Sequence, residues 1–326
     1  MTFVKKAFVF SVLAAFGAGA AATAQNSLNG AGATFPAPFY QRAFSDLASS
    51  GGPQVNYQSV GSGAGVRQFI AGTVDFGATD EPISAADAAK VKRGVVQLPT
   101  VGGTIAIAYN KPGCSLKLTQ KQAADIFLGA ITDWKQLKCA AGKITVVHRS
   151  DGSGTTFAFT NSLSAFSPAW KSKVGEGKSV KWPVGVGGKG NEGVAGVVQN
   201  TPGSIGYLNQ AYVKGAIKAA ALQNKAGKFV MPNLKSGAAA LNNIRLDSNL
   251  AGEDANPAGA DSYPISTLTW VLAYKTGNGA KAPRIRQAIS FLLSPKAQGK
   301  ADDLGYVPLR GRVLNSAKKA VGNIGS

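Results

Sequence analysis

Residues 148–155 combine the residue types that can bind a tetrahedral oxyanion. They read His-Arg-Ser-Asp-Gly-Ser-Gly-Thr, follow the apolar, β-like run 144–147, and precede a segment whose apolar residues have helical spacing. A turn from strand to helix points backbone N–H groups, hydroxyls and the positive end of the helix dipole at one place. Arg149 can donate two parallel hydrogen bonds to an anion there. The pattern predicts an anion site, and it leaves open whether the anion is cleaved or carried.

Three further segments place small polar residues just before a predicted helix. They are residues 30–35, 61–63 and 78–82. One such loop alone is typical of an ordinary turn and helix cap. Four of them favour a shared pocket, because loops at the carboxyl ends of parallel strands converge at one edge of a sheet. We expect its donors to be the hydroxyls of Thr34, Ser62, Ser153 and Thr155, the backbone N–H groups of Phe35 and Gly154, and the guanidinium of Arg149.

Two carboxylates in these loops have different expected roles. Asp151 can orient Arg149 and offset its charge, or it can simply stabilise the turn. Asp80 repels an anion unless the anion carries a proton, and hydrogen phosphate carries one while sulfate at neutral pH does not. As an acceptor, Asp80 therefore selects phosphate over sulfate. The alternative for Asp80 is a helix cap ahead of Pro82.

A secreted phosphatase with Ser153 or Thr155 as nucleophile is the alternative from another class. The only histidine, His148, precedes Arg149 on a predicted strand, so its side chain should point to the opposite face. One histidine and two cysteines also argue against a zinc hydrolase. We therefore expect no catalytic residue, no metal and no cofactor.

The segment 185–190 fits the pattern G-x-G-x-x-G of dinucleotide-binding loops. Gln210 stands twenty residues further on, where that motif carries an acid. We interpret the segment as a flexible loop.

The chain alternates β-like and helix-like runs, which predicts an α/β fold with mostly parallel sheets. After removal of a leader, about 300 residues remain, enough for two domains. Residues 102–109 form a long apolar run that could cross between domains, and residues 210–262 give no clear pattern. Strands are expected at 54–60, 73–77, 144–149, 204–208 and 266–274, and helices at 39–47, 66–70, 84–91, 119–127, 191–199 and 285–292.

The first two dozen residues have the form of a secretory signal. Lys5 and Lys6 precede the mostly apolar run 7–16, and Ala22-Thr23-Ala24 is a cleavage motif, which predicts a mature chain starting at Gln25. The apolar run is too short and too rich in Ala and Gly for a good membrane anchor. We expect a soluble protein exported to the periplasm.

Two cysteines and a strong positive charge accompany this leader. In an oxidising compartment Cys114 and Cys139 predict one disulfide, with two free buried thiols as the alternative. A net charge as high as +19 is common among nucleic-acid-binding proteins. Here the lysines are scattered and not interleaved with aromatic residues, so we predict a solvated basic surface and no nucleic-acid partner.

At these residues the chain resembles the periplasmic phosphate-binding proteins of high-affinity ABC phosphate uptake systems. The matching stretches are 30–40, 55–84, 149–160, 180–199 and 202–208, while 210–262 matches poorly. The resemblance implies a protein that carries phosphate to an inner-membrane permease driven by a cytoplasmic ATPase, and that is a monomer before docking. A binding protein for another oxyanion is the remaining alternative, and Asp80 argues against it.

The resemblance also implies a fold and a set of site residues. The fold is the two-lobed, type II periplasmic-binding-protein architecture, in which each lobe is a mostly parallel sheet flanked by helices. Crossing strands near 107–110 and 271–274 form the hinge. One lobe then comprises 25–107 and 274–326, and the other 108–273. The implied phosphate contacts are Thr34, Phe35, Ser62, Asp80, Arg149, Ser153, Gly154 and Thr155, with Asp151 as the partner of the arginine.

Overall fold

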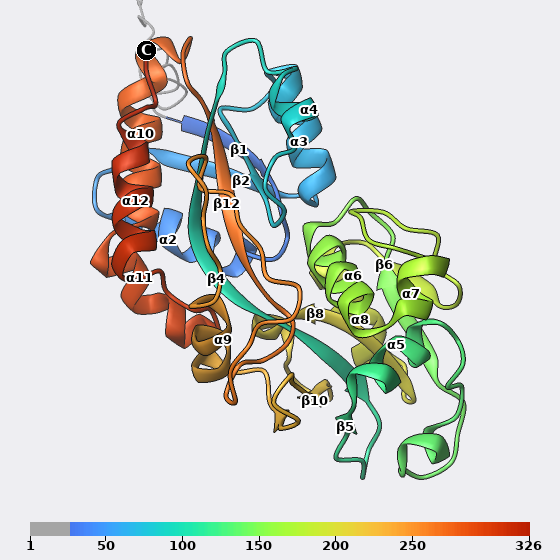
Figure 1. Ribbon diagram of the computed structural model, residues 1–326. Coiled ribbons are helices and arrows are strands. Elements are labelled where there is room, and N and C mark those ends of the chain that lie inside the picture. The colour runs from blue at the N-terminus through green and yellow to red at the C-terminus, as the bar shows by residue number, and fades with distance from the viewer. Residues whose placement is uncertain (1–26) are drawn as a thin grey trace, which may run out of the picture.

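The computed structural model describes residues 27–326, so the predicted signal peptide lies outside the described residues. The chain folds into two lobes, each a sheet flanked by helices (Figure 1). This confirms the predicted α/β, two-lobed architecture. No helix within 27–326 is long and apolar enough to cross a membrane.

One long strand, β4 (Val95–Asn110), belongs to the sheets of both lobes. Its first part, up to Thr104, pairs with β12 (Ser266–Tyr274), and its second part, from Ile105, pairs with β8 (Ser204–Asn209). All of its residues except Val95 are buried. A strand that is buried on both faces carries a continuous run of apolar residues instead of an alternating pattern. This burial explains the long apolar run at 102–109.

The first lobe has the strand order β2-β1-β3-β12-β4. The strands β1, β2 and β3 are parallel, and β12 is antiparallel to both of its neighbours. The three parallel strands therefore end at the same edge of the sheet, where their following loops meet. Their bounds are Ser27–Gly32 for β1, Gln54–Ser59 for β2 and Phe76–Thr79 for β3.

The second lobe continues the sheet in the order β4-β8-β6-β7. Strand β6 is parallel to both β8 and β7, and β8 is antiparallel to β4. The strands β6 and β7 span Thr145–Arg149 and Val186–Gly188, and β9 (Lys218–Ala219) pairs with β4. A separate small sheet contains β11 (Phe229–Val230), β10 (Ala221–Gln223) and β5 (Lys117–Leu118).

Helices cover both faces of the sheets (Figure 1). Those near the first-lobe strands are α2 (Ala37–Ser49), α3 (Ser62–Ala71), α4 (Ala85–Ala88), α9 (Leu234–Leu241), α10 (Ala282–Leu292), α11 (Pro295–Ala301) and α12 (Gly311–Val321). The second-lobe helices are α5 (Gln120–Phe127), α6 (Gly154–Phe166), α7 (Pro168–Lys173) and α8 (Gly190–Asn200). Short 3-10 turns span Trp134–Leu137, Gln210–Tyr212, Gly279–Lys281 and Asp302–Leu304.

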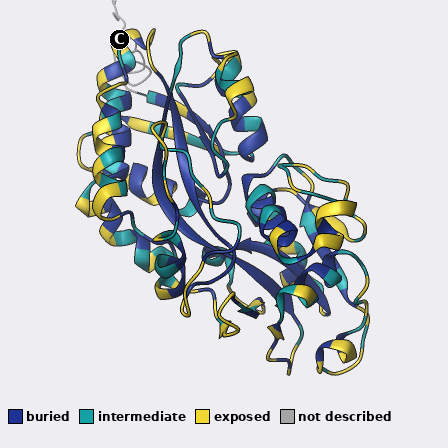
Figure 2. Ribbon diagram, in the orientation of Figure 1, coloured by how far each residue is buried: buried dark blue, intermediate teal, exposed yellow. Residues whose placement is uncertain are grey.

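The core lies between the sheets and these helices. Figure 2 shows the central strands buried and the outer faces of the helices exposed. Helix α3 packs Val66 and Phe69 against one face of the first-lobe sheet, and α8 packs Val194 and Val198 against the second-lobe sheet. These apolar pairs recur at helical spacing, as expected for amphipathic helices that cover a sheet.

The pairing of β12 moves the predicted second crossing toward the N-terminus. We predicted crossing near 271–274, with residues up to 273 in the second lobe, but β12 pairs along its length with β3 and β4 of the first lobe. The chain rejoins the first lobe near Ile265, whose carbonyl accepts a hydrogen bond from Ile105 N at 2.8 Å. Likewise β4 changes partner after Thr104, ahead of the predicted 107–110. The other lobe boundaries stay a prediction.

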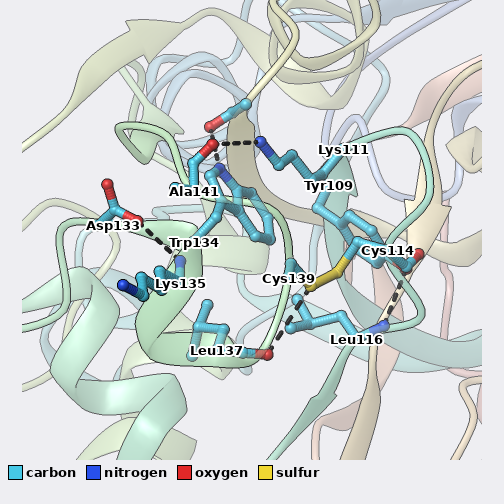
Figure 3. The surroundings of a disulfide bond; sticks show 11 residues. Tyr109, Lys111, Cys114, Leu116, Asp133, Trp134, Lys135, Leu137, Cys139 and Ala141 are labelled. Atoms are coloured by element: carbon cyan, nitrogen blue, oxygen red, sulfur yellow. Dashed lines mark hydrogen bonds between the residues drawn. A yellow bond between two sulfur atoms is a disulfide. The ribbon is translucent and has the colours of Figure 1, made fainter.

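The predicted disulfide between Cys114 and Cys139 is present, with their Cα atoms 5.4 Å apart (Figure 3). It lies beside the buried Tyr109, whose hydroxyl donates to Cys114 O at 2.9 Å and accepts from Leu116 N at 3.1 Å. The ring of Trp134 packs 5.9 Å from that of Tyr109. The bond thus ties the loop after β4 to the turn at Trp134–Leu137.

Candidate anion-binding site

Three first-lobe loops converge at the carboxyl edge of the parallel strands. Thr34 follows β1, Ser62 is the first residue of α3, and Asp80 follows β3. The parallel register aligns the ends of these strands. Just beyond the last residue of β1, Ala33 N donates to Ala78 O of β3 at 2.9 Å. Asp80 N then donates to the Ser62 hydroxyl at 3.2 Å. The structure therefore brings Ser62 and Asp80 into direct contact, as the convergence of the loops predicts.

The second-lobe loop connects β6 to α6. Arg149 is the last residue of β6, and Ser153 is the N-cap of α6, where its hydroxyl accepts from Thr156 N at 3.0 Å. The next two residues, Gly154 and Thr155, start the helix. Their backbone N–H groups have no carbonyl partner inside the helix, so they remain available to an anion at its N-terminus.

Arg149 and Asp151 form a two-point ion pair. The distances are 2.7 Å from Arg149 Nε to Asp151 Oδ1 and 2.6 Å from Nη2 to Oδ2. Gly190 N also donates to Asp151 Oδ1, at 3.0 Å. Burial raises the pKa of Asp151, but the hydrogen bonds and charge of Arg149 outweigh it and hold the pKa below its usual value. The expected pairing of the two side chains is thus present, and it fixes the plane of the guanidinium.

The third nitrogen of the same guanidinium, Arg149 Nη1, is buried and has no hydrogen-bond partner within residues 27–326. The Arg149 side chain is only 1% exposed, so water offers little compensation. A buried donor on a charged group is costly to leave unpaired. The pair with Asp151 therefore leaves one strong, pre-aligned donor for an anion.

Asp80 is buried and accepts hydrogen bonds from both lobes. Thr269 Oγ1 donates to Oδ1 at 2.8 Å, and Thr155 Oγ1 donates to Oδ2 at 3.2 Å. Burial raises the pKa of Asp80 to about 7, although the bond from Thr269, the charge of Arg149 and the bond from Thr155 each oppose the rise. Near neutral pH, Asp80 can therefore accept a proton from a ligand or keep one of its own.

The loops of the two lobes touch one another directly. Gly63 N donates to Gly152 O at 2.8 Å across the boundary. A Cβ atom on Gly154 would lie 2.7 Å from both Asp80 N and Ser62 Oγ. Only glycine allows this approach, so any larger residue at 154 would hold the lobes apart.

Phe35 and His148 lie at the edges of this arrangement. Phe35 is buried in the turn beside Thr34, and its carbonyl accepts from the Tyr306 hydroxyl at 2.6 Å. His148 stacks on Trp182 with ring centroids 4.9 Å apart, and its Nδ1 lies 3.0 Å from Arg149 O. Within the described chain His148 makes no hydrogen bond to Ser153, in keeping with the prediction that it points away.

Two residues of the site were missed by sequence reasoning. Thr269 lies within β12, whose residues are all buried. The sequence of this strand gives no sign that the Thr269 hydroxyl faces the site. Asn191, which the sequence indicates only as the start of the helix at 191–199, is the second residue of α8 and hydrogen-bonds to both Thr34 and Thr155.

The interpretation of 185–190 as a flexible loop is wrong. Val186–Gly188 forms β7, Gly190 opens α8, and Gly190 N binds Asp151. The signal that could have identified this loop is its small residues between a strand and a helix. The other four loops show the same pattern. In residues 27–326 no group of three His, Cys, Asp or Glu side chains could hold a metal ion.

Comparison with known proteins agrees with this fold. The sequence model of the PBP superfamily domain matches residues 18–296. The Phosphate-binding protein PstS of Pasteurella multocida is 42% identical over 329 residues, covering 95% of this chain and 93% of that protein.

Solved structures share the fold at lower identity. A phosphate-binding protein from Stenotrophomonas maltophilia matches with a TM-score of 0.76, covering 90% of this chain and 93% of that one at 20% identity. An ABC-type phosphate transport receptor from Vibrio cholerae gives a TM-score of 0.57, covering 86% and 99% at 20% identity. The family model and the close relative together place the sequence: the chain belongs to the PBP superfamily and, within it, to the family of the phosphate-binding protein PstS.

Proposed function

We propose that this protein captures inorganic phosphate between its two lobes and delivers it to an ABC permease. The observation that carries the proposal is the buried, unpartnered Arg149 Nη1, held in place by Asp151 in a site that also contains the carboxyl of Asp80. The relative from Pasteurella multocida is a phosphate-binding protein, and the structural neighbour from Vibrio cholerae is an ABC-type phosphate transport receptor.

The charges of the site favour phosphate among tetrahedral anions. Asp151 neutralises most of the charge of Arg149, so neutral dipoles carry much of the binding, and Asp80 requires an oxygen that bears a proton. Hydrogen phosphate meets this requirement and sulfate does not. The proposed phosphate contacts are Thr34, Phe35, Ser62, Asp80, Arg149, Ser153, Gly154 and Thr155.

Closure of the two lobes around the anion completes this set. The donors Thr34, Phe35 and Ser62 come from the first lobe, and those of Arg149 and the start of α6 from the second. Only a closed arrangement joins them, and contacts such as Gly63 N to Gly152 O support such an arrangement. We propose that the two segments joining the lobes, at Thr104/Ile105 and near Ile265, act as the hinge.

The cellular setting belongs to the same proposal. The secretory signal, with cleavage after about Ala24, sends a soluble monomer to the periplasm. There it meets the permease and its cytoplasmic ATPase. The proposed role is binding, without a catalytic residue or a cofactor.

Isothermal titration calorimetry of residues 25–326 at pH 8 tests the proposal. We expect tight binding of phosphate and sulfate binding weaker by at least about a hundredfold, the size of effect that one buried acceptor facing an unprotonated oxygen produces. Equal affinity for the two anions would contradict the role of Asp80. Steady turnover of a chromogenic phosphate ester would instead favour the phosphatase.

A further inference from the structure

Asn191 lies between the two threonines of the site. Its side-chain amide donates to Thr34 Oγ1 at 2.8 Å and to Thr155 Oγ1 at 3.2 Å, and its backbone N–H donates to Thr34 Oγ1 at 3.0 Å. Thr34 belongs to the first lobe, whereas Asn191 and Thr155 belong to the second. All three residues are buried.

The orientation of this amide is fixed by its other side. Asn191 Oδ1 accepts from Asn209 N, a backbone donor, at 2.9 Å. The amide oxygen must therefore face Asn209, and both amide hydrogens must face the threonines. The rotated amide would place two donors against each other at Asn209.

This orientation decides where the Thr34 proton can go. A hydroxyl has two acceptor positions and one proton, and Asn191 occupies both acceptor positions of Thr34. Among the hydrogen bonds within residues 27–326, Thr34 Oγ1 donates none. Its proton is therefore directed away from Asn191 and is available to an acceptor such as an anion oxygen.

The second threonine is oriented in the same way. Thr155 Oγ1 accepts from Asn191 and donates to Asp80 Oδ2 at 3.2 Å. Its proton thus supports the carboxylate of Asp80, and its backbone N–H remains available at the start of α6. Asn191 therefore acts on both the donor side and the carboxylate side of the site.

The residues next to Asn191 also span the lobes. Glu192 Oε1 accepts from the Ser59 hydroxyl of the first lobe at 2.9 Å and from the Tyr212 hydroxyl at 3.1 Å. The same Tyr212 proton is shared with Thr34 O, which lies 2.7 Å from the Tyr212 hydroxyl oxygen. The start of α8 is thus held against the turn that carries Thr34, which keeps Asn191 within reach of it.

We propose that Asn191 is a positioning residue that directs the Thr34 hydroxyl proton at phosphate and the Thr155 hydroxyl proton at Asp80. The inference rests on the proposed function, because it assigns Asn191 a part in phosphate binding. It predicts that Asn191 acts through Thr34, and not through the stability of the lobe.

A double-mutant cycle measured by phosphate calorimetry at pH 8 tests this. Asn191→Ala should weaken phosphate binding by about tenfold to a hundredfold in the wild-type background. In the Thr34→Val background the Thr34 hydroxyl is absent and the Thr155 proton is still held by Asp80 Oδ2, so the same change should cost less than about threefold. Asn200→Ala is the matched control, since Asn200 is an exposed amide at the other end of α8 and bonds only to Gly196 O, at 2.9 Å.

A second variant covers the case in which Asn191→Ala fails to fold. Asn191→Asp keeps the acceptor for Asn209 N and the size of the side chain. Its second carboxylate oxygen takes the place of the amide nitrogen and accepts the Thr34 proton instead of orienting it toward phosphate. The loss of phosphate affinity should therefore again be larger with Thr34 present than in the Thr34→Val background.

The possible results separate this inference from the proposed function. Equal losses in the two Thr34 backgrounds, or an Asn191→Ala variant that binds phosphate normally, would overturn the role of Asn191 and leave phosphate binding intact. A wild-type protein that does not bind phosphate would overturn the proposed function itself.

Discussion

Thr155 Oγ1 lies 3.2 Å from Asp80 Oδ2, and this hydrogen bond joins the start of α6 in one lobe to the loop after β3 in the other. The carboxylate expected to recognise the ligand is therefore also a contact between lobes. In the proposed function, ligand recognition and lobe closure share the same atoms, so a change at Asp80 should affect both.

Asp80→Asn should reduce the preference for phosphate over sulfate. An amide can donate to an unprotonated oxygen, so sulfate loses its repulsive neighbour, while the proton of hydrogen phosphate loses its best acceptor. We expect phosphate binding to weaken by about tenfold to a hundredfold and sulfate binding to strengthen. Calorimetry with both anions at pH 8 measures the ratio. An unchanged ratio would show that Asp80 plays no part in selection.

The raised pKa of Asp80 predicts how stability depends on pH without ligand. The folded protein holds this proton up to about pH 7, whereas an ordinary aspartate loses it near 3.8. The contribution of Asp80 is therefore fully present below about pH 3.8 and is lost as pH rises through about 7. A shift of this size corresponds to at most about 4 kcal/mol. Thermal unfolding at pH 5 and pH 8 should show a smaller loss of stability in Asp80→Asn than in the wild type.

Glu253 is the necessary control for that experiment. Burial raises its pKa to about 7 as well, so it contributes with the same sign over the same pH range. The variant Glu253→Gln should remove only the part of the pH dependence of stability that Glu253 contributes. A wild-type profile that Asp80→Asn leaves unchanged would mean that Asp80 ionises normally in the folded protein.

Arg149→Lys should weaken phosphate binding although it keeps the positive charge. An ammonium cannot hold both oxygens of Asp151 and also present a third, fixed donor to the ligand. The loss of one charge-assisted hydrogen bond corresponds to about 1.5–3 kcal/mol, or roughly tenfold to more than a hundredfold in affinity. Arg312→Lys, at an exposed position on α12, is the matched control. Equal phosphate affinities for these two variants would argue against a ligand contact at Arg149.

Removal of the disulfide should lower stability and leave phosphate affinity unchanged. Cys114 and Cys139 close a loop away from the site residues, with a sequence separation of 25. Loop entropy assigns such a bond about 3 kcal/mol. The double variant Cys114→Ser with Cys139→Ser should therefore unfold at lower denaturant concentration. A large change in phosphate affinity would show that the two regions are coupled.

The loops that meet in the candidate site could be predicted from the sequence, because each has a local signal. The loops carrying Thr34, Ser62, Asp80 and Arg149 each place small polar residues between a strand and a helix, and this chemistry is visible without a fold. Asn191 is the second residue of α8 and directly follows a loop of the same kind, but 185–190 was compared with an unrelated motif and interpreted as flexible.

The remaining misses depend on contacts between distant parts of the chain. Thr269 reaches Asp80 only because β12 lies beside β3, and strand order cannot be read from a run that is buried on both faces. For the same reason, the sequence did not show where the chain returns to the first lobe. Residues 210–262 gave no pattern because they form short strands and turns, with one helix of eight residues, α9.

The position of β12 has a consequence for the order in which the molecule can be assembled. This strand lies between β3 and β4 and belongs to the last quarter of the chain. An emerging polypeptide can complete the sheet of the second lobe while the sheet of the first still lacks the strand that joins β3 to β4. The first lobe, and with it the anchoring of Asp80 by Thr269, forms only after Ser266–Tyr274 has been synthesised, so a chain truncated before that strand cannot build the binding site.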